Sequence, residues 1–231
     1  MKRLRIGYVP LSDVAVLVAA AERGFGEAEG LELELTREVS WANIRDKLIL
    51  GHFDAAHILA PFAIATSLGL GHLRVPLIAP FALNLNGNAI TVSNELFLEM
   101  VALFGRATEG PQETAKALAQ LVCKRREAGA RPLAFGMVFP FSTHTYLLRH
   151  WLRLGGIDPD TDVHLVVVPP PYMAESLRNG LLDGFCVGSP WNSLAVDAHV
   201  GRIVALGVIS RAAPPKRFSP CRRPTPSGIL T

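Results

Sequence analysis

Charged side chains are scarce in this sequence of 231 residues: they make up 19% of it, whereas hydrophobic residues make up 49%. So much apolar material can form a substantial core, which excludes a disordered or fibrous protein. The length fits one large domain or two modest ones. The uncharged stretches 55–73 and 75–94 are interrupted by proline, glycine or asparagine. We therefore expect them to be buried core, with no direct membrane insertion.

Basic residues are also scarce outside the C-terminal end. The net charge is +3, but residues 210–231 hold five basic side chains and no acidic one, which leaves 18 basic against 20 acidic side chains in residues 1–209. A nucleic-acid partner normally requires a basic face drawn from several elements. We therefore expect no nucleic-acid partner. The tail 210–231 also holds five prolines and is expected to be disordered.

Motifs of enzymes and metal sites are missing. The three cysteines form no Cys-x-x-Cys pair, which excludes a zinc knuckle and a framework of several disulfides and fits a reducing compartment. His144 and His150 are six residues apart and do not share a helical face, as two zinc-binding histidines must. The sequence contains no phosphate loop, dinucleotide fingerprint or nucleophile elbow. We expect no metal, no cofactor and no enzymatic activity.

Strand-like and helix-like segments alternate along the chain, which is typical of an α/β protein. Expected strands are 4–9, 31–35, 55–59, 75–83, 132–139, 163–168, 184–187 and 202–208. Expected helices are 13–23, 40–50, 61–68, 114–128, 142–154, 172–182 and 190–199. Unbroken apolar runs such as 75–83 suit buried parallel strands. The pattern indicates two α/β units, with a boundary at 84–93 and a return crossing at 190–202.

Three strand-to-helix junctions carry polar or aromatic residues where open parallel sheets bind ligands. The first is Ser40-Trp41-Ala42-Asn43, where free backbone N–H groups and an indole ring would face a crevice. The second runs from Phe139 to His144, and its imidazole at a helix N-terminus suits an anion. The third combines 168–171 with 186–192. Each also has a purely structural interpretation, as a helix cap with a packed ring, a satisfied histidine or a turn.

Six longer motifs together resemble one family over residues 3–206. They are 40–48 (SWANIRDKL), 54–61 (DAAHILAP), 83–90 (LNLNGNAI), 155–160 (GGIDPD), 168–171 (VPPP) and 185–192 (FCVGSPWN). The family comprises the nitrate- and bicarbonate-binding solute receptors of ABC transporters and their signal-less cytoplasmic relatives that sense nitrate or nitrite.

The resemblance implies a two-lobed, type II periplasmic-binding-protein-like α/β fold, in which each lobe is a mainly parallel sheet flanked by helices. Lobe I would comprise 1–83 and 200–209, and lobe II 84–199. Family members continue with a segment that completes the first lobe, so we expect this lobe to be incomplete. We hypothesise a frameshift between Ala205 and Arg211, with 210–231 as an out-of-frame tail.

The resemblance also implies a site for a small oxyanion, nitrate or nitrite, between the lobes. Its lining would be Trp41, Asn88, Thr143, His144, Pro170 and Val187. Asn88 is shorter than the amide of some nitrate binders, which leaves room for a water or another anion. Ser189 stands where transporter receptors often carry Glu, which favours the cytoplasmic sensor.

The implied partner is then a cytoplasmic antitermination-type regulator or, for a transport receptor, the membrane subunits of an ABC transporter. As written the protein is expected to be cytoplasmic, and periplasmic if an N-terminal leader is missing. The alternatives are a bicarbonate or alkanesulfonate transporter receptor, a thiamine-pyrimidine-synthesis-like protein of the same fold, and a non-functional remnant.

Overall fold

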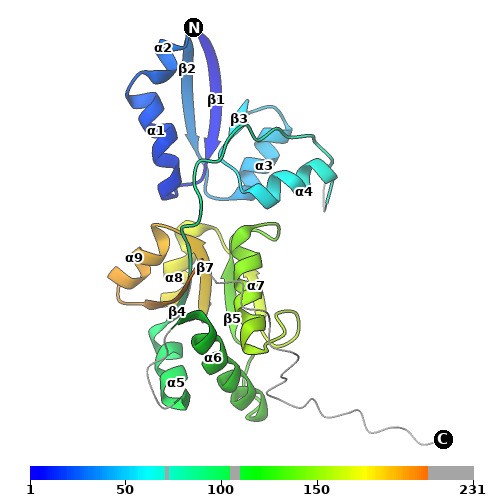
Figure 1. Ribbon diagram of the computed structural model, residues 1–231, viewed down its shortest axis with the longest axis vertical. Helices are drawn as coiled ribbons and strands as arrows, with labels where there is room; N and C mark the ends of the chain where they lie inside the picture. Colours follow the sequence, from blue (N-terminus) through cyan, green and yellow to red (C-terminus); the bar gives the residue numbers. More distant parts are fainter. Residues whose placement is uncertain (71–72, 105–109, 208–231) are drawn as a thin grey trace, which may run out of the picture.

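The computed structural model describes residues 1–70, 73–104 and 110–207, which form two α/β units (Figure 1). Each unit is built on its own sheet, three-stranded in the order β2-β1-β3 and five-stranded in the order β6-β5-β7-β4-β8. The expected disordered tail 210–231 lies outside the described residues. Within the described ranges, no helix combines the length and the apolarity that a membrane crossing requires.

The first unit has β1 (Lys2–Tyr8) at the centre of its sheet, parallel to both neighbours. The other elements are β2 (Leu31–Arg37), β3 (Ala55–Ala56), η1 (Ser12–Val14), α1 (Ala15–Glu22), α2 (Phe25–Ala28), α3 (Trp41–Ile49) and α4 (Ala60–Leu68). All of them match predicted segments except α2, and β3 is shorter than the predicted strand 55–59. The Phe53 ring packs against Gly7 of β1, where an added Cβ would lie 2.3 Å from that ring.

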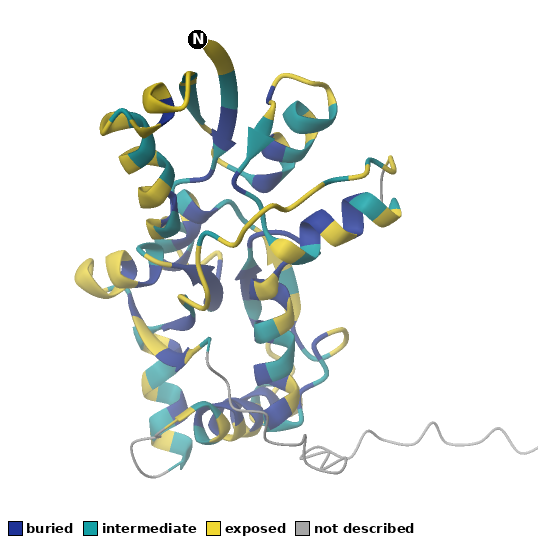
Figure 2. Ribbon diagram, turned by 45° about the horizontal axis from the view of Figure 1, so that its top comes forward, coloured by how far each residue is buried: buried dark blue, intermediate teal, exposed yellow. Residues whose placement is uncertain are grey.

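The predicted strand 75–83 is wrong. This segment leaves α4 without forming a helix or a strand, and it runs exposed towards the second unit (Figure 2). Ile78 is 92% exposed and Leu85 is 80% exposed. Its start is tied to α4, because Val75 N donates to Thr66 O and Leu77 N donates to Ser67 Oγ. An apolar run becomes a strand only where a neighbouring strand pairs with it.

The second sheet is mixed. β5 (Ala134–Met137) runs parallel to β6 (His164–Val167) and to β7 (Gly184–Gly188). β4 (Asn88–Ser93) is antiparallel to β7 and to β8 (Gly201–Leu206). The assignment of 200–209 to the first lobe is therefore wrong for 201–206, because this strand completes the sheet of the second unit. The backbone of 201–206 pairs with the edge of β4 that β7 does not occupy.

Helices cover both faces of this sheet. They are α5 (Asn94–Phe104), α6 (Gly110–Glu127), α7 (Thr143–Gly155), η2 (Pro170–Tyr172), α8 (Met173–Arg178) and α9 (Trp191–Asp197). The helices α6, α7, α8 and α9 fall on predicted helices, whereas α5 was not predicted and η2 begins two residues before the predicted helix 172–182. The α6 and α7 backbones approach closely, since a Cβ at Gly155 would lie 2.2 Å from Ala115 O. The Trp151 indole donates to Thr114 Oγ1 at 3.1 Å inside this contact.

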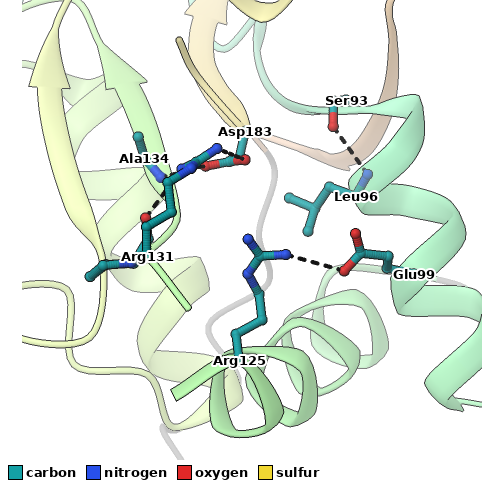
Figure 3. Close-up of polar contacts among 8 residues, drawn as sticks. Ser93, Leu96, Glu99, Arg125, Arg131, Ala134 and Asp183 are labelled. Atoms are coloured by element: carbon teal, nitrogen blue, oxygen red, sulfur yellow. Dashed lines mark hydrogen bonds and ion pairs between the residues drawn. The ribbon is translucent and has the colours of Figure 1, made fainter. Parts of the chain in front are cut away.

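Asp183 joins three strands of the second sheet (Figure 3). Its carboxylate accepts the Ala134 N–H at 2.7 Å and two guanidinium N–H groups of Arg131 at 2.8 and 2.9 Å. Its own backbone N–H donates to Ala134 O, and its carbonyl accepts from Ser93 N. The side chain is only 15% exposed. One residue thus holds the beginnings of β5 and β7 to the end of β4.

We predict that Asp183→Ala lowers the free energy of unfolding by about 2 kcal/mol, because a partly buried backbone donor at Ala134 loses its acceptor. Urea unfolding followed by circular dichroism measures this change. Asp160→Ala is the matched control, since that carboxylate also pairs with arginine but is 59% exposed. An equal loss of stability in both variants would contradict the assigned role of Asp183.

Candidate functional site

The two units meet across one shared apolar cluster. Trp41, Ile44 and Phe62 of the first unit belong to it together with Phe139 and Val187 of the second. The Phe62 and Phe139 rings lie 5.1 Å apart between centroids. Because each unit buries these side chains against the other, the space between them is closed to bulk water at its centre.

Hydrogen bonds reinforce this contact at one edge. Ser12 N donates to Ser189 O at 2.9 Å, and the two hydroxyls lie 3.2 Å apart. The Trp191 indole donates to Pro10 O at 2.9 Å. The segment that follows β7 is thereby fixed against the loop that follows β1, and the strand ends of both sheets face the same region.

Trp41 opens α3 and lies in the middle of this region. Ser40 caps the helix by accepting the Asn43 N–H at 3.2 Å, and Trp41 and Ile44 are the residues that α3 buries. Trp41 is 0% exposed. The centroid of its ring lies 5.8 Å from that of His144 and 6.4 Å from that of His57. The first helix start predicted as a binding element therefore faces the second.

His144 sits in the first turn of α7. Ser142 caps this helix by accepting the Thr145 N–H at 3.0 Å, and Thr145 Oγ1 donates to Phe139 O at 2.7 Å. These bonds hold the turn rigidly, and His144 is only 2% exposed. Burial lowers the pKa of His144 to about 4, although the nearby Asp13 carboxylate partly opposes this shift. The imidazole is therefore neutral at pH 7.

Asp13 and His57 form a second polar pair in the same region. Asp13 Oδ2 lies 3.1 Å from His57 Nε2, and His57 is 4% exposed. Burial raises the pKa of Asp13, but the hydrogen bond and charge of His57 outweigh it, so the pKa of this carboxyl lies below its usual value. Asp13 thus contributes a negative charge next to the two imidazoles and the indole.

Five buried polar atoms of this cluster have no hydrogen-bond partner within the described part of the chain. They are Asp13 Oδ1, Trp41 Nε1, His57 Nδ1, His144 Nδ1 and His144 Nε2. Buried polar groups are nearly always hydrogen-bonded, because desolvation without a partner costs about 1–3 kcal/mol. They belong to side chains of both units, and the rings of His144 and His57 lie 5.8 and 6.4 Å from that of Trp41, an arrangement that can accept a polar ligand.

Asn88 also lies near His144, because both side chains approach the backbone of Gly188. A Cβ added at Gly188 would lie 2.9 Å from Leu11 Cδ2, 3.5 Å from Asn88 Oδ1 and 3.6 Å from His144 Nε2. Any larger residue would thus push into the space between the Asn88 amide and the His144 imidazole. Glycine at this position therefore avoids a clash with Leu11 and lets the backbone approach Asn88 and His144.

The other predicted residues lie at different depths. Val187 is 0% exposed and packs in the shared apolar cluster, and Pro170 is buried at the beginning of η2. Thr143 is exposed at the first position of α7, whereas its neighbour Thr145 is buried in the cap of the helix. The structure thus brings Trp41, Asn88 and His144 together most closely.

The prediction missed Asp13, His57 and Gly188. Asp13 entered the prediction only as the first residue of the expected helix 13–23, and His57 only as a member of the motif 54–61. The motifs 54–61 and 185–192, which contain His57 and Gly188, were the available signal. A protein metal site usually takes three or more ligands, and the described residues contain no group of three His, Cys, Asp or Glu that could hold one.

The sequence matches the model of the NMT1-like family over residues 1–214. The nitrate/nitrite binding protein NrtA of Nostoc sp. PCC 7120 is 35% identical over 223 residues, which is 94% of this chain. The bicarbonate transport ATP-binding protein CmpC of Synechocystis sp. PCC 6803 is 39% identical over 206 residues, or 87% of this chain.

A solved structure agrees with these matches. The periplasmic nitrate-binding protein NrtA from Synechocystis PCC 6803 superposes with a TM-score of 0.78 at 30% identity over 89% of this chain. This likeness confirms the expected two-lobed, periplasmic-binding-protein-like α/β fold.

The chain spans about half the length of the NrtA proteins, 48% of the Nostoc protein and 51% of the solved chain, and 28% of CmpC. Its match to the family model nevertheless extends over nearly the whole sequence. The two-lobed fold agrees with that match, and the chain belongs to the NMT1-like family.

Proposed function

We propose that this protein binds a small oxyanion between its two units, as a receptor and not as an enzyme. The observation that carries the proposal is that the neighbouring rings of Trp41, His57 and His144 hold buried nitrogens without a partner in the described part of the chain. The names of the similar proteins support it, since they are binding and transport proteins for nitrate, nitrite or bicarbonate.

The chemistry of the cluster suits a weakly hydrated, planar monoanion. Such an ion needs several moderate hydrogen-bond donors and a site without water more than it needs a strong counter-charge. Each hydrogen bond to a charged acceptor contributes about 1.5–3 kcal/mol, so two or three of them contribute roughly 3–9 kcal/mol before the costs of association are subtracted.

Nitrate or nitrite is the proposed ligand, by likeness to NrtA. Bicarbonate is the second candidate, and two observations favour it: the similarity to CmpC and the short amide of Asn88, which borders the site beside His144. The lining proposed from the sequence remains Trp41, Asn88, Thr143, His144, Pro170 and Val187, to which we add Asp13, His57 and Gly188.

Closure of the two units on the anion would signal its presence to a partner. We propose the membrane subunits of an ABC transporter, because one similar protein is named as the ATP-binding protein of bicarbonate transport and another as a periplasmic nitrate-binding protein. This role places the protein in the periplasm. A cytoplasmic sensor acting on an antitermination-type regulator would use the same closure.

We predict that nitrate or nitrite raises the melting temperature of this protein, and that sulfate and an alkanesulfonate do not. A ligand at about one hundred times its dissociation constant adds roughly 2.7 kcal/mol of stability, which corresponds to about 5–10 °C at this chain length. A thermal-shift panel that includes bicarbonate measures the order of preference. If none of the five anions shifts the transition of the folded protein, the proposal is wrong.

Trp41→Phe should weaken anion binding by about tenfold and change stability little, because it removes the indole donor and keeps most of the packed ring. Isothermal titration gives the affinity, and urea unfolding gives the stability. Trp151→Phe is the matched control, because Trp151 is equally buried and donates to Thr114 far from the cluster. This control should lose stability and keep its affinity for the anion. If Trp151→Phe weakened binding and Trp41→Phe did not, the assignment of the site to Trp41 would be wrong.

A further inference from the structure

The imidazole of His144 is unusual because neither of its nitrogens has a hydrogen-bond partner among the described residues. Both ring nitrogens are buried and unpartnered within the described part of the chain. A neutral imidazole has one donor and one acceptor nitrogen, whereas an imidazolium has two donors. The oxygens of nitrate only accept hydrogen bonds. The two ring nitrogens point away from each other, so a small anion accepts a hydrogen bond from one of them. Protonation makes both nitrogens donors, so that the anion meets a donor whichever nitrogen faces it.

The charges around His144 also favour a protonated ring when an anion is bound. Asp13 from η1 places a carboxylate beside it, and His57, from the segment after β3, shares that carboxylate. Trp41 from α3 and Asn88 from β4 contribute no charge. A monoanion added to this group would bring a second negative charge to a buried site, and protonation of one further imidazole would balance it.

The basic side chains on the two helices that supply Trp41 and His144 have acidic partners already. On α3, Arg45 pairs with Asp46 at 2.7 Å and Lys47 pairs with Glu38. On α7, Arg149 and Arg153 both lie within pairing distance of Asp160. If one of these cations moved to the anion, its carboxylate would lose its ion pair. The free-energy cost would be largest at Glu38, which is only 6% exposed.

We propose that the anion enters this site together with one proton, which His144 takes up. The inference rests on the proposed function and specifies how the same site is regulated. Without anion, burial holds the pKa of His144 at about 4, so the ring is neutral in ordinary buffers. The bound anion stabilises the imidazolium and raises that pKa. Binding therefore tightens as the pH falls.

The sign of the pH effect follows from linkage. Where one proton is taken up per anion, the dissociation constant falls about tenfold for each unit by which the pH is lowered. This dependence ends below about pH 4, where the free protein already carries the proton. A site with fixed charges would show no such slope.

The test is isothermal titration of the full chain with nitrate at about pH 6, in two buffers with different ionisation enthalpies. The slope of the observed enthalpy against the buffer enthalpy gives the number of protons taken up, which we expect to be about one. His144→Gln keeps a donor and an acceptor but cannot titrate. It should bind nitrate at least tenfold more weakly, with an uptake near zero and no pH slope.

His52→Gln is the matched control, because His52 is exposed in the loop before β3 and its loss should leave the uptake at about one. Nitrate binding to the wild-type protein without proton uptake would overturn the inference while leaving the proposed function intact. Uptake that persists in His144→Gln but disappears in His57→Gln would overturn the assignment to His144. If the wild-type protein binds none of nitrate, nitrite and bicarbonate, the proposed function fails, and the inference fails with it.

Discussion

The packing of Trp41 against His144 is the contact on which the candidate site depends. Each residue stands at the beginning of a helix, and each helix belongs to a different unit. Serine caps fix both first turns, so the two rings meet in one orientation at 5.8 Å between centroids. Because both rings are almost completely buried, their polar nitrogens are removed from water, and a hydrogen-bond partner for them has to lie between the units.

This burial also sets the electrostatics of the region. A buried imidazole is cheaper to keep neutral than charged, which explains why Asp13 does not hold His144 in its protonated form. Asp13 instead pairs with His57, and the basic residues of α3 and α7 pair with carboxylates of their surroundings. The site therefore offers neutral donors, and its charge changes only by proton exchange with the solvent.

The sequence predicted elements well wherever local signals governed them. The cap at Ser40 and the apolar face beyond it predicted α3. The helix-like segment 142–154 predicted α7, and the structure shows that Ser142 caps this helix as well. Strand pairing was predicted less well, because the partner of a strand is distant in the chain. The run 75–83 had the composition of a buried strand, but this segment lies mostly exposed after α4 and pairs with no strand among the described residues. The strand 201–206 paired with β4 of the second sheet and not with the first sheet.

Residue chemistry by itself predicted the α/β class, the two helix starts and the candidates Trp41 and His144, whereas Asn88 became a candidate only through the resemblance to the nitrate- and bicarbonate-binding family. Capping and periodicity act within about four residues, so a sequence displays them directly. Only the tertiary structure decided that Asp13 bonds His57 across 44 residues, that Gly188 borders Asn88 and His144, and that Thr143 is exposed. Burial and charge pairing depend on which distant segments pack together, and no local pattern encodes that choice.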